Sequence, residues 1–170
     1  MEPLRIGVLG AARISDKAII EPARNTGHRL VVVAARDRNR AEKFAQDGNI
    51  ERVVDSYQEV IDDPEVEAIY NPLPNGLHGP WNLRAIAAGK HVLSEKPSAS
   101  NAAEARDVRD AVNASGVKFM EAFHYRYHPV MKRMLELASS GELGELTNID
   151  LHMSFPNTDA TDPRWDFDLA

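Results

Sequence analysis

The sequence predicts an α/β fold built on a doubly wound parallel sheet. Short apolar segments of strand length alternate along the chain with longer segments of helical pattern. The apolar segments are nearly continuous in their hydrophobicity, which indicates strands buried on both faces of a sheet. Capping residues mark several helix ends at the places where the periodicity also changes. Together these observations favour a parallel sheet with helices on both sides.

Five apolar segments are expected to form the strands of the sheet. They are residues 4–9, 28–35, 66–71, 91–94 and 117–123. Between them, helices are expected over 39–48, ending at Gly48, and over 75–90, capped by Asn75 and stopped by Gly89. A further helix follows Asn101, with Glu104 as its capping-box partner and Gly116 as its stop.

A different pattern follows residue 123. The segment VMKRMLELASSGELG after Pro129 predicts one more helix, and residues 145–155 alternate apolar and polar side chains like a half-exposed strand. We therefore predict a nucleotide-binding domain at 1–123 and, at 124–170, the beginning of a truncated α+β substrate domain. The strand at 145–155 is expected to lack most of its sheet partners and to leave an apolar edge exposed.

Composition restricts the classes of function. The 170 residues are 43% hydrophobic and 27% charged and include no cysteine, which excludes disulfides, thiolate nucleophiles and cysteine-ligated zinc. The formal net charge of −6 argues against a nucleic-acid partner. No apolar run approaches the ~20 residues of a membrane span, and no secretory leader follows Met1, so we expect no membrane partner and a cytoplasmic location.

A nucleotide signal follows the first expected strand. In GVLGAARIS, Gly10, Ala12 and Ser15 occupy the positions of the G-x-G-x-x-G fingerprint, with small residues replacing two of the glycines. Small side chains allow the backbone to approach a pyrophosphate at a helix N-terminus, where free N–H groups favour an anion. Small-residue turns between strands and helices also occur for packing reasons, so the motif by itself leaves both interpretations open.

The end of the second strand bears on the type of dinucleotide. An acidic residue there binds the ribose hydroxyls of NAD, whereas an arginine accommodates the 2′-phosphate of NADP. The strand ends in VVVAARDRNR, so Arg36 stands about 20 residues beyond the fingerprint, followed by Arg38 and Arg40. Asp37 keeps NAD as the alternative, and a solvated helix start with incidental arginines is the other interpretation. The pattern favours NADP.

Longer motifs resemble the Gfo/Idh/MocA oxidoreductase family. The resemblance rests on four segments: GVLGAARIS (7–15), YNPLPNGLHGPWNLRAIAAGKHVLSEKPSA (70–99), MEAFHYRYHP (120–129) and DPRWDFDLA (162–170). Within the family, the chain looks most like the NADP-dependent D-xylose dehydrogenases and dimeric dihydrodiol dehydrogenases. The resemblance implies a Rossmann-type domain and hydride transfer between NADP and a sugar or vicinal diol.

The resemblance also implies a set of site residues. Lys96 would be the catalytic lysine of a Glu-Lys-Pro motif, and Tyr125 and Trp165 would lie near the substrate. The residues implied in cofactor binding are Gly10, Ala12, Arg13, Ile14, Arg36, Arg38, Pro72, Leu73, Asn75, His78, Glu95, Lys96, Pro97 and Arg126. In the family the peptide bond before the proline of this motif, here Pro97, is often cis. The full-length proteins are expected to be homo-oligomers.

The position of Glu95 and Lys96 agrees with this chemistry on independent grounds. Ligands of open α/β sheets bind beyond the carboxyl ends of the strands, and this pair follows the expected strand at 91–94. Oxidising an alcohol requires removal of the hydroxyl proton, and a lysine amine accepts a proton when burial and a neighbouring cation lower its pKa. Glu95 could orient the ammonium or contact the ribose. An exposed Glu-Lys turn is the commoner fate of such a pair, but the strand end and the flanking motifs favour a site.

Two further expectations concern metals and the missing partner of the lysine. His124 and His128 are four residues apart, but Pro129 makes a shared helix face improbable, so no metal site is predicted.

In the family an acidic residue and a His or Tyr that shares the acid–base work lie beyond the position of Ala170. We therefore expect only the N-terminal portion here, inactive or weakly active alone. A non-catalytic nucleotide-binding regulator and a glycosidase that uses the cofactor transiently are the alternative functions.

Overall fold

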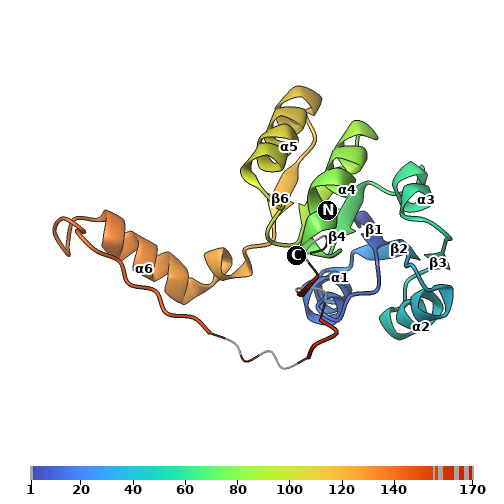
Figure 1. The fold of residues 1–170 in the computed structure, drawn as a ribbon, viewed down its shortest axis with the longest axis horizontal. Helices are drawn as coiled ribbons and strands as arrows, with labels where there is room; N and C mark the ends of the chain where they lie inside the picture. Colours follow the sequence, from blue (N-terminus) through green and yellow to red (C-terminus); the bar gives the residue numbers. More distant parts are fainter. Residues whose placement is uncertain (1, 155, 157–158, 163–164, 167–168, 170) are drawn as a thin grey trace. The chain divides into compact units, whose positions relative to one another are not determined.

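The structure is a computed structural model, and it describes residues 2–154, 156, 159–162, 165, 166 and 169 (Figure 1). The chain divides into two compact units. The first comprises Met1–Ala122 together with Pro163–Ala170, and the second comprises Phe123–Asp162. The two units are described separately below.

The first unit contains a six-stranded sheet in which every neighbouring pair is parallel. Its strands are β1 (Arg5–Leu9), β2 (Arg29–Ala34), β3 (Arg52–Val53), β4 (Ala68–Asn71), β5 (His91–Ser94) and β6 (Phe119–Glu121). The strand order is β3-β2-β1-β4-β5-β6, which is the order of the dinucleotide-binding doubly wound fold. The predicted fold class is confirmed.

Helices cover both faces of this sheet. They are η1 (Asp16–Ile20, a π-helical turn), α1 (Glu21–Thr26), α2 (Arg38–Gly48), α3 (Tyr57–Asp62), α4 (Asn75–Ala87) and α5 (Ala102–Ser115). Side chains of α3, α4 and α5 form one apolar cluster with residues such as Leu9 and Ile69, while η1, α1 and α2 form a second cluster with Val8 and Val33. Burial on both sides explains why the strands read as continuous apolar runs.

The helix ends follow the capping signals with one difference. The side chain of Asn101 accepts hydrogen bonds from the backbone of Ala103 and Glu104, as predicted for the start of α5. In α4, however, the cap is Pro74 and not Asn75, which is the first helical residue. Helix α2 ends at Gly48, as predicted, and Asn49 beyond it adopts the left-handed conformation of a helix C-cap.

Two elements were not expected from the pattern. Strand β3 has only two residues and helix α3 only six, so neither is long enough to show a clear periodicity. A capping box does precede α3: Ser56 accepts from the backbone of Glu59, and the Ser56 hydroxyl donates to the Glu59 carboxylate. That local signal could have identified the helix.

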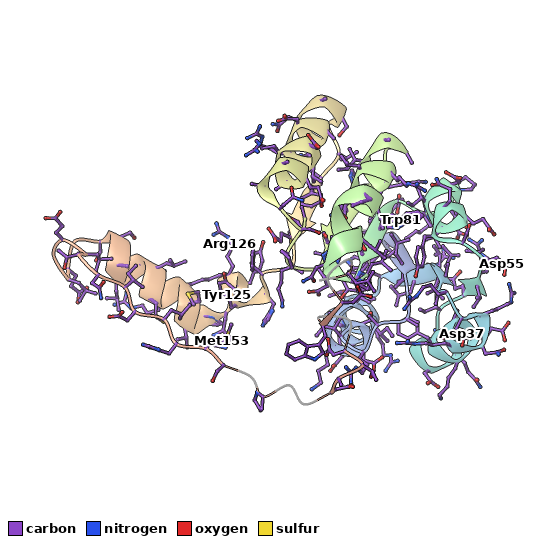
Figure 2. All side chains as sticks on the ribbon, in the orientation of Figure 1. Asp37, Asp55, Trp81, Tyr125, Arg126 and Met153 are labelled. Atoms are coloured by element: carbon purple, nitrogen blue, oxygen red, sulfur yellow. The ribbon has the colours of Figure 1, made fainter. Side chains whose placement is uncertain are left out.

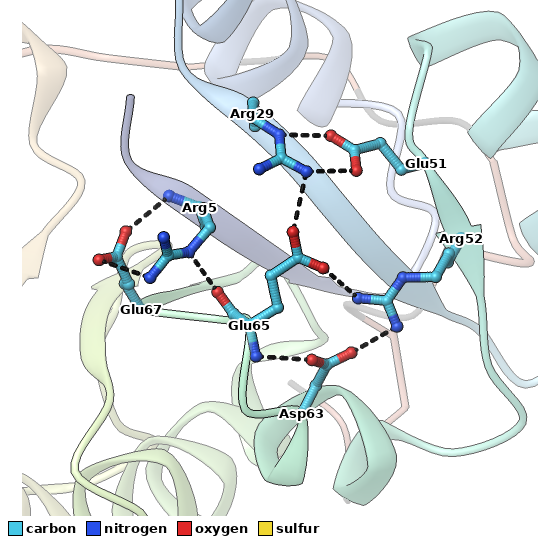
Figure 3. Close-up of polar contacts among 7 residues, drawn as sticks. All are labelled: Arg5, Arg29, Glu51, Arg52, Asp63, Glu65 and Glu67. Atoms are coloured by element: carbon cyan, nitrogen blue, oxygen red, sulfur yellow. Dashed lines mark hydrogen bonds and ion pairs between the residues drawn. The ribbon is translucent and has the colours of Figure 1, made fainter. Parts of the chain in front are cut away.

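An ion-pair network ties the amino ends of the strands together (Figure 3). It consists of Arg5, Arg29, Glu51, Arg52, Asp63, Glu65 and Glu67. Most of its side chains are partly exposed, so each pair contributes little on its own, but the Asp63 carboxylate is only 9% exposed and lies 2.7 Å from Arg52. The Arg52 hydrogen bond lowers the pKa of Asp63. The network lies at the amino ends of the strands, on the side of the sheet opposite the candidate site.

The second unit contains two helical segments. A 3₁₀ turn, η2 (His124–Tyr127), precedes α6 (Pro129–Ser139). The backbone N–H of Val130, in the first turn of α6, donates a hydrogen bond to the His128 ring. The strand predicted at 145–155 does not form in its described part, 145–154, which is extended coil. Parallel or antiparallel pairing needs a neighbouring strand, and none pairs with these residues within the described part of the chain. Ile149, Leu151 and Met153 are more than three-quarters exposed as a result.

No helix in the described part of the chain combines the length and the apolar character that crossing a bilayer requires.

Candidate functional site

The loop after β1 forms the first wall of the site. Gly10 has φ +88°, and its N–H donates to the Ala34 carbonyl at the end of β2 over 2.7 Å. A Cβ at this position would lie 3.1 Å from Cδ2 of Leu73, which belongs to the loop after β4. The glycine therefore lets three strand ends approach one another closely. Ala12 carries on the turn, and the exposed Arg13 and Ile14 lead into η1.

The residues after β2 separate into different roles. Asp37 caps α2 by accepting from the Arg40 N–H, so its carboxylate already has a partner. Arg38 donates to Glu42 and Asp55 and is therefore paired on the surface (Figure 2 labels Asp37 and Asp55). Arg40 instead donates to the carbonyl of Ala11 in the glycine loop over 2.6 Å.

Arg36 differs from the arginines that follow it. Within the described residues, its guanidinium makes no hydrogen bond or ion pair, and the side chain is exposed at the carboxyl end of β2. Tyr57 lies beside this strand end, and burial raises the pKa of its phenol, an effect that the positive charges of Arg36 and Arg40 oppose. The Tyr57 ring meets Trp81 of α4 edge-on, with the two ring centroids 5.2 Å apart. An unpaired cation near a glycine loop suits a phosphate.

The turn after β5 carries Glu95, Lys96 and Pro97. The Lys96–Pro97 peptide bond is cis, and the side chain of Lys96 is exposed at the carboxyl edge of the sheet. Glu95 accepts from the hydroxyl of Tyr70 over 3.0 Å, and no ion pair joins it to Lys96 in the described structure. Burial, followed by the nearby Glu95 carboxylate, raises the pKa of Tyr70, which therefore remains a donor. Glu95 is thus oriented by Tyr70 of β4, and its second carboxylate oxygen accepts from the backbone N–H of Lys96 over 3.4 Å.

The loop after β4 and the first turn of α4 form the next part of the site, which includes a buried imidazole. Pro72 and Leu73 are buried at the strand end, and Asn75 begins α4. Nδ1 of His78 lies 2.5 Å from the Pro97 carbonyl, which can only accept, so Nδ1 carries the proton. Nε2 is then an acceptor; although His78 is only 1% exposed, this atom has no hydrogen-bond partner in the described structure. A buried, unsatisfied acceptor suits a ligand with a hydroxyl or amide donor.

Three residues implied by the resemblance lie elsewhere in the chain. Tyr125 and Arg126 belong to η2 in the second unit, where the Tyr125 side chain is half exposed (Figure 2). Trp165 is 64% exposed and groups with the first unit. Their roles stay predictions. The structure thus brings Gly10 together with Leu73, and His78 together with Pro97. It adds Tyr57 and Tyr70, which the pattern did not single out as site residues, and it places Arg40 against the glycine loop.

Comparison with known proteins gives a consistent family. The model of the Gfo/Idh/MocA family, an oxidoreductase family with an NAD-binding Rossmann fold, matches residues 4–123. The chain is 40% identical over 168 residues to D-xylose 1-dehydrogenase (NADP(+)) 2 of Haloferax volcanii, covering 98% of this chain and 51% of that protein. It is also 40% identical over 145 residues to trans-1,2-dihydrobenzene-1,2-diol dehydrogenase of Mus musculus, covering 84% and 44% of the two chains.

A solved structure extends the likeness to three dimensions. A 3-ketoreductase from Actinomadura kijaniata, in complex with NADP and TDP-benzene, superimposes with a TM-score of 0.76 at 30% identity. The match covers 82% of this chain and 43% of that one. The chain therefore spans about half the length of the relatives that it matches.

Proposed function

Because the chain belongs to the Gfo/Idh/MocA oxidoreductase family, we propose that it is the cofactor-binding part of an NADP-dependent dehydrogenase acting on a sugar or vicinal diol. The observation that carries the proposal is the position of Lys96. It stands at the carboxyl edge of β5, in a turn held against His78 in the first turn of α4. In a doubly wound sheet this edge is where the ligand binds.

The residues present fit an NADP molecule. Gly10 provides the close approach for a pyrophosphate, and the loop at Ala12, Arg13 and Ile14 leads into the helical turn that follows. Arg36 offers an unpaired guanidinium for a 2′-phosphate, whereas Arg38 is already engaged. The relatives named for NADP support this choice over NAD, as does the capping role of Asp37.

The loops after β4 and β5 would hold the reacting end. We assign Pro72, Leu73, Asn75, Glu95 and Pro97 to the walls beside the nicotinamide. Nε2 of His78 would accept a hydrogen bond from a donor group of the ligand. NADP, when bound, supplies the acceptor for the hydride of the alcohol carbon. Lys96 would hold the substrate hydroxyl and take its proton as the C–H bond breaks.

The proposal extends to the second unit and to the whole protein. Tyr125 and Trp165 are proposed to contact the substrate and Arg126 the cofactor, on the strength of the resemblance alone. The Haloferax and mouse relatives, by their names, act on a sugar and on a dihydrodiol, which supports that substrate class. We also propose a cytoplasmic, homo-oligomeric enzyme.

The test combines binding with turnover. Fluorescence titration should give a lower Kd for NADPH than for NADH, and incubation of the full-length protein and NADP⁺ with aldoses and vicinal diols should form NADPH. Lys96→Ala should remove at least ~99% of the turnover and leave the Kd of NADPH within about threefold. Lys118→Ala, at the exposed amino end of β6, is the matched control and should change neither. Full turnover in Lys96→Ala would overturn the assignment of the lysine.

A further inference from the structure

Within the described structure, the side chain of Asn82, in the middle of α4, makes its hydrogen bonds with the segments that carry the proposed site. Its side chain is 1% exposed. Its Oδ1 accepts from Nδ2 of Asn71 over 2.8 Å. Its Nδ2 donates to Oγ of Ser94 over 2.9 Å and to the carbonyl of Ser98 over 3.0 Å. One amide therefore connects the end of β4, the end of β5 and the turn that follows Lys96.

The turn is held at successive backbone groups. His78 contacts the Pro97 carbonyl, Asn82 donates to the Ser98 carbonyl, and Glu121 of β6 accepts from the Ser98 N–H over 2.8 Å. His78 and Asn82 are four residues apart, so they lie on one face of α4 and act together. The backbone directly after Lys96 is thus fixed by side chains from one helix and one strand.

The other end of the Asn82 contact fixes the neighbouring loop. Asn71 is fully buried, and its Oδ1 accepts from the N–H of Leu73 over 3.3 Å. The carbonyl of Asn71 accepts from the N–H of Glu95 over 2.9 Å. A shift of the Asn71 side chain would therefore move the loop after β4 and the turn after β5 together.

The simpler interpretation is that Asn82 is a satisfied polar residue of the core. A leucine of the same branched shape would remove all three hydrogen bonds and leave polar groups of Asn71 and Ser98 without this partner, so either interpretation accounts for an amide here. The partners decide between the two interpretations. None of them is a helix end or a distant loop; each belongs to β4, β5 or the Lys96 turn.

We propose that Asn82 is a positioning residue, which sets the loop after β4 and the Glu95–Lys96–Pro97 turn at a fixed distance from each other. Because these two segments form the proposed nicotinamide end of the site, the inference rests on the proposed function. Within the described residues, the loops after β1 and β2, which are proposed to hold the phosphates, make no hydrogen bond to Asn82. Its loss should therefore disturb the nicotinamide end and spare the anchoring of the phosphates.

The test uses Asn82→Asp, which keeps the shape of the side chain and replaces the donor to Ser98 by an acceptor. In the chain without ligand, amide hydrogen exchange of residues 94–99 should become about tenfold faster, while the strand β1 should exchange as before. Ile61→Val, a buried substitution in α3, is the control for lost stability. It should leave residues 94–99 unchanged. Asn82→Leu, which adds no charge, repeats the measurement if Asn82→Asp does not fold.

Binding of NADPH gives the second measurement. In Asn82→Asp the Kd should stay within about threefold of the parent, because the phosphate contacts are intact. The nicotinamide emission of the bound NADPH should shift toward that of free NADPH, which a general loss of stability would not produce. Unchanged exchange at 94–99, or equal acceleration in Ile61→Val, would overturn the positioning role. If the parent does not bind NADPH, the proposed function fails, and the exchange experiment still decides whether Asn82 holds the turn.

Discussion

Replacing Gly10 by alanine should destabilise the protein by two separable effects. The first is the backbone conformation, because φ is +88° and an L-residue pays about 1–2 kcal/mol in the left-handed region. A gain of about 0.4–1 kcal/mol from the stiffer unfolded chain offsets part of this. The second is crowding, because the new Cβ would lie 3.1 Å from Cδ2 of Leu73. Relieving that contact costs about 1 kcal/mol more.

Gly89 provides a matched control for the first effect. It has φ +73°, and a Cβ there would meet nothing within 4 Å. Gly89→Ala should therefore lower the free energy of unfolding by about 0.5–1 kcal/mol, and Gly10→Ala by about 2 kcal/mol. For a chain of 170 residues, the latter corresponds to a fall in Tm of about 4–8 °C.

A double-mutant cycle with Leu73→Ala isolates the crowding. Leu73 is 6% exposed, so Leu73→Ala is itself destabilising, by about 2–5 kcal/mol. In that background the cost of Gly10→Ala should fall to that of Gly89→Ala, a coupling of about 1 kcal/mol. Urea unfolding followed by circular dichroism measures all four variants. If Gly10→Ala costs no more than Gly89→Ala, the close approach of the two loops is refuted.

Four further substitutions test the charges. Arg36→Ala should raise the Kd of NADPH about 10–100-fold and leave that of NADH unchanged, because a charge-assisted contact to phosphate contributes about 1.5–3 kcal/mol. Arg38→Ala should change the Kd of NADPH less than about threefold, because its guanidinium is already paired; the reverse ranking would assign the phosphate to Arg38. Asp63→Asn should cost about 1 kcal/mol at pH 7, whereas Asp47→Asn, in an exposed helical pair, should cost less than about 0.5 kcal/mol. Arg52 lowers the pKa of Asp63 in the folded state, so the Asp63 carboxylate stabilises the fold above its unfolded pKa of about 3.9. This stabilisation is lost as the pH falls through the folded pKa. In acid unfolding, the free energies of unfolding of the parent and of Asp63→Asn should therefore converge.

Much of the fold was predictable because local signals and packing agree. Five of the six strands are apolar runs long enough to recognise, and the start of α5 follows from Asn101 and Glu104 alone. The short β3 and α3 escaped, since two and six residues carry little periodicity. The strand expected at 145–155 does not form in its described part, although its pattern is clear. Its alternating pattern is suited to a sheet, but a strand forms only when a partner satisfies its backbone.

The sequence by itself determined the parallel α/β fold, the glycine loop after β1 and the strand-end position of Lys96. These depend on backbone conformation, on hydrophobic period and on motifs within a few residues. Only the tertiary structure decided which charged and polar groups face the site: Arg40 and not Arg38 contacts the glycine loop, and Tyr70 orients Glu95. Tyr70 and Glu95 are 25 residues apart, and a side chain chooses among partners that folding brings within hydrogen-bond distance. No local pattern records that choice.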